Sequence, residues 1–198
     1  SVPDPSLIGL TGGIAAGKSA ALSILGELGA ATISTDEVVH ELLGSEEVRD
    51  RLIDRWGPDV APGGAVDRGR VGAIVFEDPD ELRWLESTLH PLVGREVARW
   101  RDGLGDEVAV AVVEVPLLFE GTMEPIFDAT IAISAADAER KRRADERGTG
   151  ALEARSGRQL SQEEKAARAT HAVANDGSLE DLEAELRALY PTLEAAAR

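Results

Sequence analysis

This chain contains five short apolar runs. None of them alternates between polar and apolar residues. They are Leu7–Leu10, Ala30–Ile33, Val108–Val115, Thr130–Ile133 and the weaker His171–Ala174. Strands that are covered on both faces have this character in parallel sheets. Helical periodicity fills the stretches between them, and Gly29 after the first such stretch is typical of a helix C-terminus. The pattern predicts a three-layer α/β/α fold around a mostly parallel five-stranded sheet, in one domain over residues 1–198.

Two segments depart from this alternation. The segment 37–101 has helical periodicity without a convincing strand, so we expect a helical insertion there. Within it, Asp78 as N-cap and Pro79 at the first helical position predict a helix that His90-Pro91 interrupts, followed by a second helix to about Arg101. The polar segment 140–168 contains two central glycines and is predicted to act as a lid.

Charge and composition exclude several classes of partner. The 21 basic against 37 acidic side chains give a net charge of −16, which argues against general binding to nucleic acid or to an anionic membrane. The chain has no cysteine, so disulfides and thiolate metal sites are excluded. Its apolar runs fall far short of the ~20 residues of a membrane span, and the N-terminus lacks a basic n-region. We therefore expect a cytoplasmic protein.

The most specific motif follows the first apolar run and fits the pattern G-x-x-x-x-G-K-[ST]. It consists of Gly12, Gly13, Ile14, Ala15, Ala16, Gly17, Lys18 and Ser19. A strand before it and a helix after it are the context in which backbone N–H groups converge on phosphate oxygens. Lys18 would then reach the β- and γ-phosphates of a nucleotide and Ser19 would bind Mg²⁺. The alternative is a glycine-rich turn with a surface lysine.

Two carboxylates follow predicted strands. Asp36 comes after the second run, where it could accept a proton from an acceptor hydroxyl, or serve only in the capping box that Ser34 and Glu37 would form. Glu114 closes the run before Pro116, as an acidic residue that holds Mg²⁺ does. The alternative for Glu114 is a solvated residue at the sheet edge.

Basic residues are concentrated in one part of the predicted lid. Five of them lie between Arg140 and Arg147, and Arg143 and Arg147 share a helix face. Guanidinium groups suit phosphate oxygens, so the cluster predicts a phosphate clamp; the alternative is a solvated face with arginines paired to neighbouring acids. His90 has three interpretations: a catalytic base, a substrate contact or a helix-end cap.

The order of motifs along nearly the whole chain resembles that of the dephospho-CoA kinase family. The resembling segments are Ile8–Ser19, Thr35-Asp36, Val66–Arg68 with Val75-Phe76, Leu89–Val93, Glu114–Glu120, Gln159–Lys165, Ala169 and Asn175–Gly177. Asp36 matches the second Asp of the family's Asp-x-Asp sequence, its proposed general base. Two positions depart from the family: Ser34 replaces the first Asp, and Ala20 stands where Thr is common.

The resemblance implies ATP and Mg²⁺ as cofactors and transfer of the γ-phosphoryl group to the 3′-hydroxyl of dephospho-CoA, the last step of CoA synthesis. The implied catalytic residues are Lys18, Asp36, Arg142 and Arg143. The implied ATP contacts are Gly12 to Ala20, Arg147, Asn175 and Gly177. The implied acceptor contacts are Asp36, Arg68, His90 and Leu117, and the implied metal ligands are Ser19 and Glu114.

Two other functions stay open from the residues alone. Another small-molecule or nucleoside monophosphate kinase would share the phosphate loop and differ in its acceptor. A nucleotide-dependent switch without kinase activity is the second alternative, although the chain has no Asn-Lys-x-Asp guanine-recognition sequence. We expect a monomer or a weak homo-oligomer.

Overall fold

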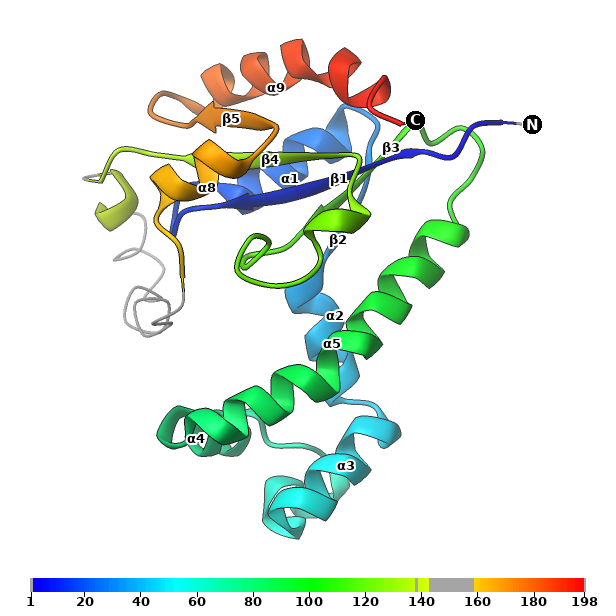
Figure 1. Ribbon diagram of the computed structural model, residues 1–198, viewed down its shortest axis with the longest axis vertical. Coiled ribbons are helices and arrows are strands. Elements are labelled where there is room, and N and C mark those ends of the chain that lie inside the picture. The colour runs from blue at the N-terminus through cyan, green and yellow to red at the C-terminus, as the bar shows by residue number, and fades with distance from the viewer. Residues whose placement is uncertain (1, 138, 143–158, 198) are drawn as a thin grey trace. The chain divides into compact units, whose positions relative to one another are not determined.

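The computed structural model describes residues 2–137, 139–142 and 159–197 (Figure 1). The chain forms two compact units. The first consists of Ser1–Ser34 and Leu104–Arg198, and the second of Thr35–Gly103. The predicted insertion at 37–101 therefore falls within the second unit. Among the described helices, none has the length and apolar character needed to cross a membrane.

The first unit is built on a five-stranded sheet, in which every strand pair is parallel. Its strands are β1 (Ser6–Gly12), β2 (Ala31–Ser34), β3 (Val110–Glu114), β4 (Ala129–Ser134) and β5 (His171–Ala174). They lie in the order β2-β3-β1-β4-β5. The five predicted strands and the α/β/α class are thus confirmed, with strand ends shifted by a few residues at most.

A core of apolar side chains covers one face of this sheet. Helices α1 (Lys18–Glu27) and α9 (Leu179–Glu194) pack against each other and the sheet. Ile8 of β1 and Leu25 of α1 are fully buried in this core, together with Leu186 of α9. Complete burial of such side chains is worth roughly 1.5–3 kcal/mol each. Gly29, with a φ of 113°, follows the C-terminus of α1, as predicted.

The opposite face is approached by a shorter helix, α8 (Gln162–Arg168), which packs against β1, β4 and β5. A capping box begins α8: Ser161 Oγ accepts a hydrogen bond from Glu164 N, and the Glu164 carboxylate accepts one from Ser161 N. Between β3 and β4 lies a short 3-10 turn, η3 (Glu124–Ile126). Helix α8 carries Lys165 to Gly12, at the carboxyl end of β1.

The second unit is helical. Its elements are α2 (Thr35–Leu43), α3 (Glu46–Trp56), the 3-10 turns η1 (Pro58–Val60) and η2 (Pro62–Gly64), α4 (Arg68–Glu77) and α5 (Pro79–Asp102). Helices α2 and α4 both pack on α5. Asp78 caps α5 through its carboxylate, which accepts a hydrogen bond from Asp80 N at 2.9 Å, and Pro79 is the first helical residue, as predicted.

The predicted break at His90-Pro91 is wrong, because α5 is one continuous helix of 24 residues with Pro91 inside it. A proline removes one backbone hydrogen bond and crowds the preceding turn. The buried residues Leu85, Leu89 and Val93 lie on both sides of Pro91 along one stripe, and Pro91 itself is exposed. Packing of the stripe therefore holds the helix across the proline.

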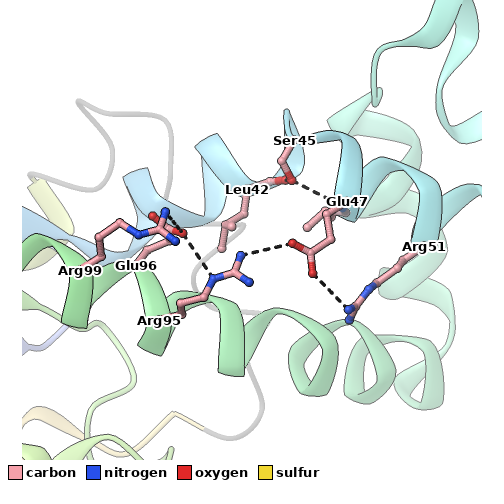
Figure 2. Close-up of polar contacts among 8 residues, drawn as sticks. Leu42, Ser45, Glu47, Arg51, Arg95, Glu96 and Arg99 are labelled. Atoms are coloured by element: carbon pink, nitrogen blue, oxygen red, sulfur yellow. Dashed lines mark hydrogen bonds and ion pairs between the residues drawn. The ribbon is translucent and has the colours of Figure 1, made fainter.

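Ion pairs add to the contact between α3 and α5 (Figure 2). The carboxylate of Glu47 lies 3.2 Å from the guanidinium of Arg51 and 3.2 Å from that of Arg95. Ser45 caps α3 by accepting a hydrogen bond from Val48 N at 3.3 Å. Exposed pairs of this kind typically contribute about 0–1 kcal/mol, so the apolar core remains the main support of this unit.

Candidate active site

The phosphate loop joins β1 to α1 in the predicted strand–loop–helix context. Two of its residues, Ala15 (φ 55°) and Gly17 (φ 106°), have left-handed backbone conformations. Gly13 N donates to Ile133 O at 3.1 Å, and Ala16 N donates to Gly13 O at 3.1 Å. The first N–H groups of a helix have no partners within the helix. The N-terminus of α1, which follows this turn, is therefore suited to bind an anion.

Lys18 extends back over the beginning of the loop. Its Nζ atom donates to Gly12 O and to Gly13 O, each at 3.5 Å, and the side chain is partly exposed. Ser19 follows on the exposed side of the first turn of α1. These positions put the ammonium group and the hydroxyl beside the loop backbone, where phosphate oxygens and a divalent cation would need them.

Close approach of other elements explains the two glycines at the start of the loop. A Cβ atom on Gly12 would lie 2.5 Å from Ile133 O. On Gly13 it would lie 2.8 Å from the Cβ atom of Gln162 and 3.3 Å from Nη1 of Arg140. Any side chain at either position would therefore displace β4 or the side chains of Gln162 and Arg140.

Asn175 comes directly after β5 and reaches the phosphate loop. Its Nδ2 atom donates to Ala16 O at 2.9 Å, and the residue is only 6% exposed. The next residue, Asp176, accepts a hydrogen bond from Ala136 N at 2.6 Å. Gly177 follows in the turn before α9. The segment that resembled the family's last strand and turn is therefore in contact with the loop.

Glu114 is the last residue of β3 and is 8% exposed. In the sheet it lies opposite Leu10 of β1 on one side and Ser34 of β2 on the other. The alternative of a solvated edge residue is thereby excluded. An acid kept at the carboxyl edge beside a phosphate loop suits Mg²⁺, which prefers oxygen ligands and retains several waters. Ser19 and Glu114 together offer such oxygen donors.

A buried lysine of α8 is the main feature that the sequence analysis did not single out. Lys165 is fully buried, and its Nζ atom lies 3.2 Å from Gly12 O, 3.0 Å from Pro116 O and 3.4 Å from Oε2 of Glu120. Burial lowers the pKa of Lys165, and the nearby charge of Lys18 adds to this, whereas Glu120 opposes it.

Gln162 on the same helix is also buried and forms hydrogen bonds with the residue directly after β4. Its Oε1 atom accepts a hydrogen bond from Ala135 N at 3.0 Å, and its Nε2 atom donates to Ala135 O at 2.7 Å. The i,i+3 spacing of Gln162 and Lys165 places both on one face of α8. That spacing was the available signal in the sequence, but a polar segment rich in glutamate is more typical of a solvated helix.

The basic cluster is described only in part. Arg142 forms an ion pair with Glu139 at 2.5 Å, and its side chain is 56% exposed. Arg140 pairs with Asp137 at 2.5 Å and lies beside Gly13. Arg143 and Arg147 lie outside the described residues, as does most of the predicted lid at 140–168.

Three predicted site residues belong to the helical unit. Asp36 is exposed in the first turn of α2, two residues after the end of β2. Arg68 begins α4 and bonds through Nη1 to the Nδ1 atom of His40. His90 is an exposed residue within α5, which excludes its interpretation as a helix-end cap. Leu117 belongs to the first unit, in the loop after β3, and is 37% exposed.

Comparisons with known proteins agree over nearly the whole chain. A family model described as dephospho-CoA kinase matches residues 6–181. The dephospho-CoA kinase of Leifsonia xyli subsp. xyli is 40% identical over 194 residues, which cover 94% of this chain and 98% of that protein.

Solved structures give the same result. A crystal structure of a Thermus thermophilus protein is similar with a TM-score of 0.80 and 34% identity, covering 96% of this chain and 98% of that one. The dephospho-CoA kinase from Campylobacter jejuni has a TM-score of 0.65 and 25% identity, covering 98% of both chains. The parallel sheet with its phosphate loop and these similarities define a kinase of the P-loop class. The chain belongs to the dephospho-CoA kinase family.

Proposed function

We propose that this protein transfers the γ-phosphoryl group of ATP to the 3′-hydroxyl of dephospho-CoA, giving CoA and ADP in the last step of CoA synthesis. The observation that carries the proposal is the family match over residues 6–181, which includes the phosphate loop and the strand-end residues around it. The sheet order supports it, because β1 lies between β3 and β4, and ligands bind parallel sheets at such a reversal of strand order.

The phosphate loop holds the donor. Backbone N–H groups from Gly13 to Ser19 surround the phosphate oxygens, and Ala20 continues the first turn of α1. Lys18 leaves the carbonyls of Gly12 and Gly13 and binds the β- and γ-phosphates, where its charge offsets negative charge that shifts during transfer. Asn175 and Gly177 lie at the adenine side of the same site.

Mg²⁺ is assigned to the edge where Ser19 and Glu114 supply oxygen atoms. When bound, the ion neutralises charge on the phosphate groups and orients them. Ser19 supplies its hydroxyl, and Glu114 holds the ion directly or through water. The position of Glu114 at the carboxyl end of β3, opposite Leu10 of β1, supports this assignment, because carboxylate oxygens are ligands that Mg²⁺ prefers.

The acceptor is assigned to three residues of the helical unit and to Leu117 of the first unit. Asp36 takes the proton of the 3′-hydroxyl as general base, while Arg68, His90 and Leu117 contact dephospho-CoA. The exposure of Asp36 in the first turn of α2 leaves its carboxylate accessible to an acceptor. Arg142, Arg143 and Arg147, from the proposed lid at 140–168, neutralise the charge of the transferring group.

With a net charge of −16, the protein is proposed to act without a nucleic-acid or membrane partner. It is further proposed to act in the cytoplasm, as a monomer or weak homo-oligomer. The single domain proposed for 1–198 contains the helical insertion at 37–101 as its substrate-binding part.

The test is incubation with ATP, Mg²⁺ and dephospho-CoA, followed by mass spectrometry of the acceptor. The proposal expects one added phosphate on the 3′-oxygen and an equal amount of ADP. Shikimate and nucleoside monophosphates serve as competing acceptors, and the Lys18→Ala variant as the inactive control. Phosphorylation of a competing acceptor with none on dephospho-CoA would contradict the proposed substrate; ATP hydrolysis without any acceptor product would favour the nucleotide switch.

A further inference from the structure

The buried ammonium group of Lys165 has a full set of partners at the base of the phosphate loop. Its three acceptors are Gly12 O, Pro116 O and the Glu120 carboxylate, at 3.2, 3.0 and 3.4 Å. An ammonium group has three N–H donors, so each donor finds one acceptor. Burying such a charge is costly unless it is paired and hydrogen-bonded. The cost and the complete pairing indicate that this position does more than fill space.

The acceptors belong to the two segments that carry the proposed chemistry. Gly12 ends β1 and begins the phosphate loop, while Pro116 follows two residues after Glu114. The Pro116 carbonyl also accepts a hydrogen bond from Thr11 Oγ1 at 3.0 Å. Lys165 therefore ties the phosphate loop to the segment after the proposed metal ligand, from a helix more than 150 positions away from Gly12.

Glu120 connects this cluster to the beginning of α8. Its Oε2 atom accepts a hydrogen bond from Leu160 N at 3.1 Å and also faces Lys165. The side chain of Glu120 is 7% exposed, so both members of the ion pair are shielded from water. Removing one member of such a pair leaves an uncompensated buried charge, which makes the pair sensitive to substitution.

Two lysines share one acceptor in this arrangement. Lys18 Nζ lies 3.5 Å from Gly12 O, and Lys165 Nζ lies 3.2 Å from the same oxygen. Under the proposed function Lys18 must leave Gly12 O to bind phosphate. Lys165 is fully buried and stays, so the carbonyl keeps a donor when Lys18 departs.

We propose that Lys165 is a positioning residue for phosphoryl transfer, which holds Gly12 O and Pro116 O in place so that the phosphate loop keeps its shape when Lys18 moves to the nucleotide. The proposal rests on the proposed kinase function. Lys165 touches neither substrate nor metal and acts through the backbone of the loop. Glu120 opposes the lowering of the Lys165 pKa by burial and so favours the charged, donating form of Lys165.

The decisive experiment is a double-mutant cycle on ADP affinity, which needs no acceptor. Lys165→Met is expected to weaken ADP binding about 10-fold. In this variant no lysine holds Gly12 O once Lys18 has moved to the nucleotide, so the loop changes shape on binding and this change opposes binding. In the Lys18→Ala background, where no lysine leaves Gly12 O, Lys165→Met should change ADP affinity less than about 2-fold. A structural role alone would give the same factor in both backgrounds, and that result would overturn the proposal.

Turnover supplies a second readout. Lys165→Met should lower kcat about 10²-fold, the size expected for a misplaced reacting group, with the KM for the acceptor nearly unchanged. Lys165→Arg keeps charge and donors and should recover most of the loss. Arg168→Met removes an exposed charge from the same helix and should leave kcat and ADP affinity at parental values. Parental kcat and ADP affinity in folded Lys165→Met would also overturn the proposal.

If Lys165→Met does not fold, Glu120→Gln takes its place in the double-mutant cycle. Its amide oxygen can still accept the hydrogen bond from Leu160 N. It should weaken ADP binding in the same direction, and again much less in the Lys18→Ala background; equal effects in both backgrounds would overturn the proposal. Should the parent bind ADP without phosphorylating dephospho-CoA, the proposed function fails while the cycle still decides the role of Lys165.

Discussion

The side-chain amide of Asn175 donates a hydrogen bond to the backbone carbonyl of Ala16 at 2.9 Å, which joins the end of β5 to the middle of the phosphate loop. Both residues are buried. The loop is thus held by a partner far along the chain as well as by its own turn. The contact should therefore support both folding and nucleotide binding.

Asn175→Ala should lower both stability and nucleotide affinity. It leaves the buried Ala16 carbonyl without this donor, which typically costs about 1–3 kcal/mol. Asn175→Asp should be worse, because it places a carboxylate oxygen against the carbonyl. Thermal unfolding and ADP titration measure the two effects. Equal Tm and ADP affinity in the parent and both variants would show that the contact does not support the loop.

Asp36→Asn should fold normally and lose kcat by about 10²–10⁴-fold, the usual contribution of a positioned general base. Asp36 is exposed in the first turn of α2, where loss of one negative charge typically costs about 0.3–1 kcal/mol, so folding should survive. ATP affinity should stay within a few-fold of the parent, whereas Lys18→Ala loses affinity and rate together. Steady-state kinetics with dephospho-CoA and nucleotide titration separate the two. Near-parental kcat in Asp36→Asn would contradict the role of Asp36 as general base and leave it only a place at the start of the helix. Glu37→Gln, at the next position, is the control.

The double variant Arg142→Ala with Arg143→Ala should lower kcat severely and weaken ATP binding less. Stability should hardly change, because the pair between Arg142 and Glu139 is largely exposed and such pairs contribute about 0–1 kcal/mol. Kinetics and thermal unfolding are measured together, with Arg99→Ala on α5 as a control for loss of an exposed arginine. Normal turnover would mean that the cluster is a solvated face.

Asp181→Asn should make stability less dependent on pH in acid. Asp181 accepts a hydrogen bond from Ser178 N at 3.0 Å in the capping box of α9, and the hydrogen bonds to Ser178 lower the pKa of Asp181 below its usual 3.8. The unfolded chain therefore takes up the proton first as the pH falls. The stabilisation by Asp181 is present above pH 3.8 and is lost as the pH falls through the lower pKa of the folded protein.

The corresponding measurement is the Tm of parent and variant between pH 7 and pH 3. The parent should have the higher Tm near neutrality, and the difference should shrink below pH 3.8. Glu185→Gln, which removes the same charge from the middle of α9, controls for net charge. A difference that stays constant down to pH 3 would contradict this account.

Features set by neighbouring residues were predictable from the sequence. The strands followed from uninterrupted apolar runs, the beginning of α5 from Asp78 and Pro79, and the phosphate loop from eight contiguous residues. Each depends on backbone conformation and burial over a short span, for which the residue types are sufficient.

Features set by distant packing were not predictable. Pro91 is tolerated within α5 because buried leucines on both sides hold the helix, and a local rule ignores that packing. Lys165 follows three polar residues in the sequence, yet α8 turns it toward Gly12 O. The contact of Asn175 with Ala16 likewise depends on the order of strands, which the motif alone does not specify.

The central position of β1 has a consequence for the order in which the protein is made. β1 is synthesised before both of its neighbours, because it pairs with Val110–Glu114 on one side and with residues 129–133 on the other. Pairing on both sides therefore waits until residue 133 has been made, and closing such long loops makes folding slow. Until then the apolar strand β1 lacks its full set of neighbours, and strand edges exposed in this way are prone to aggregation.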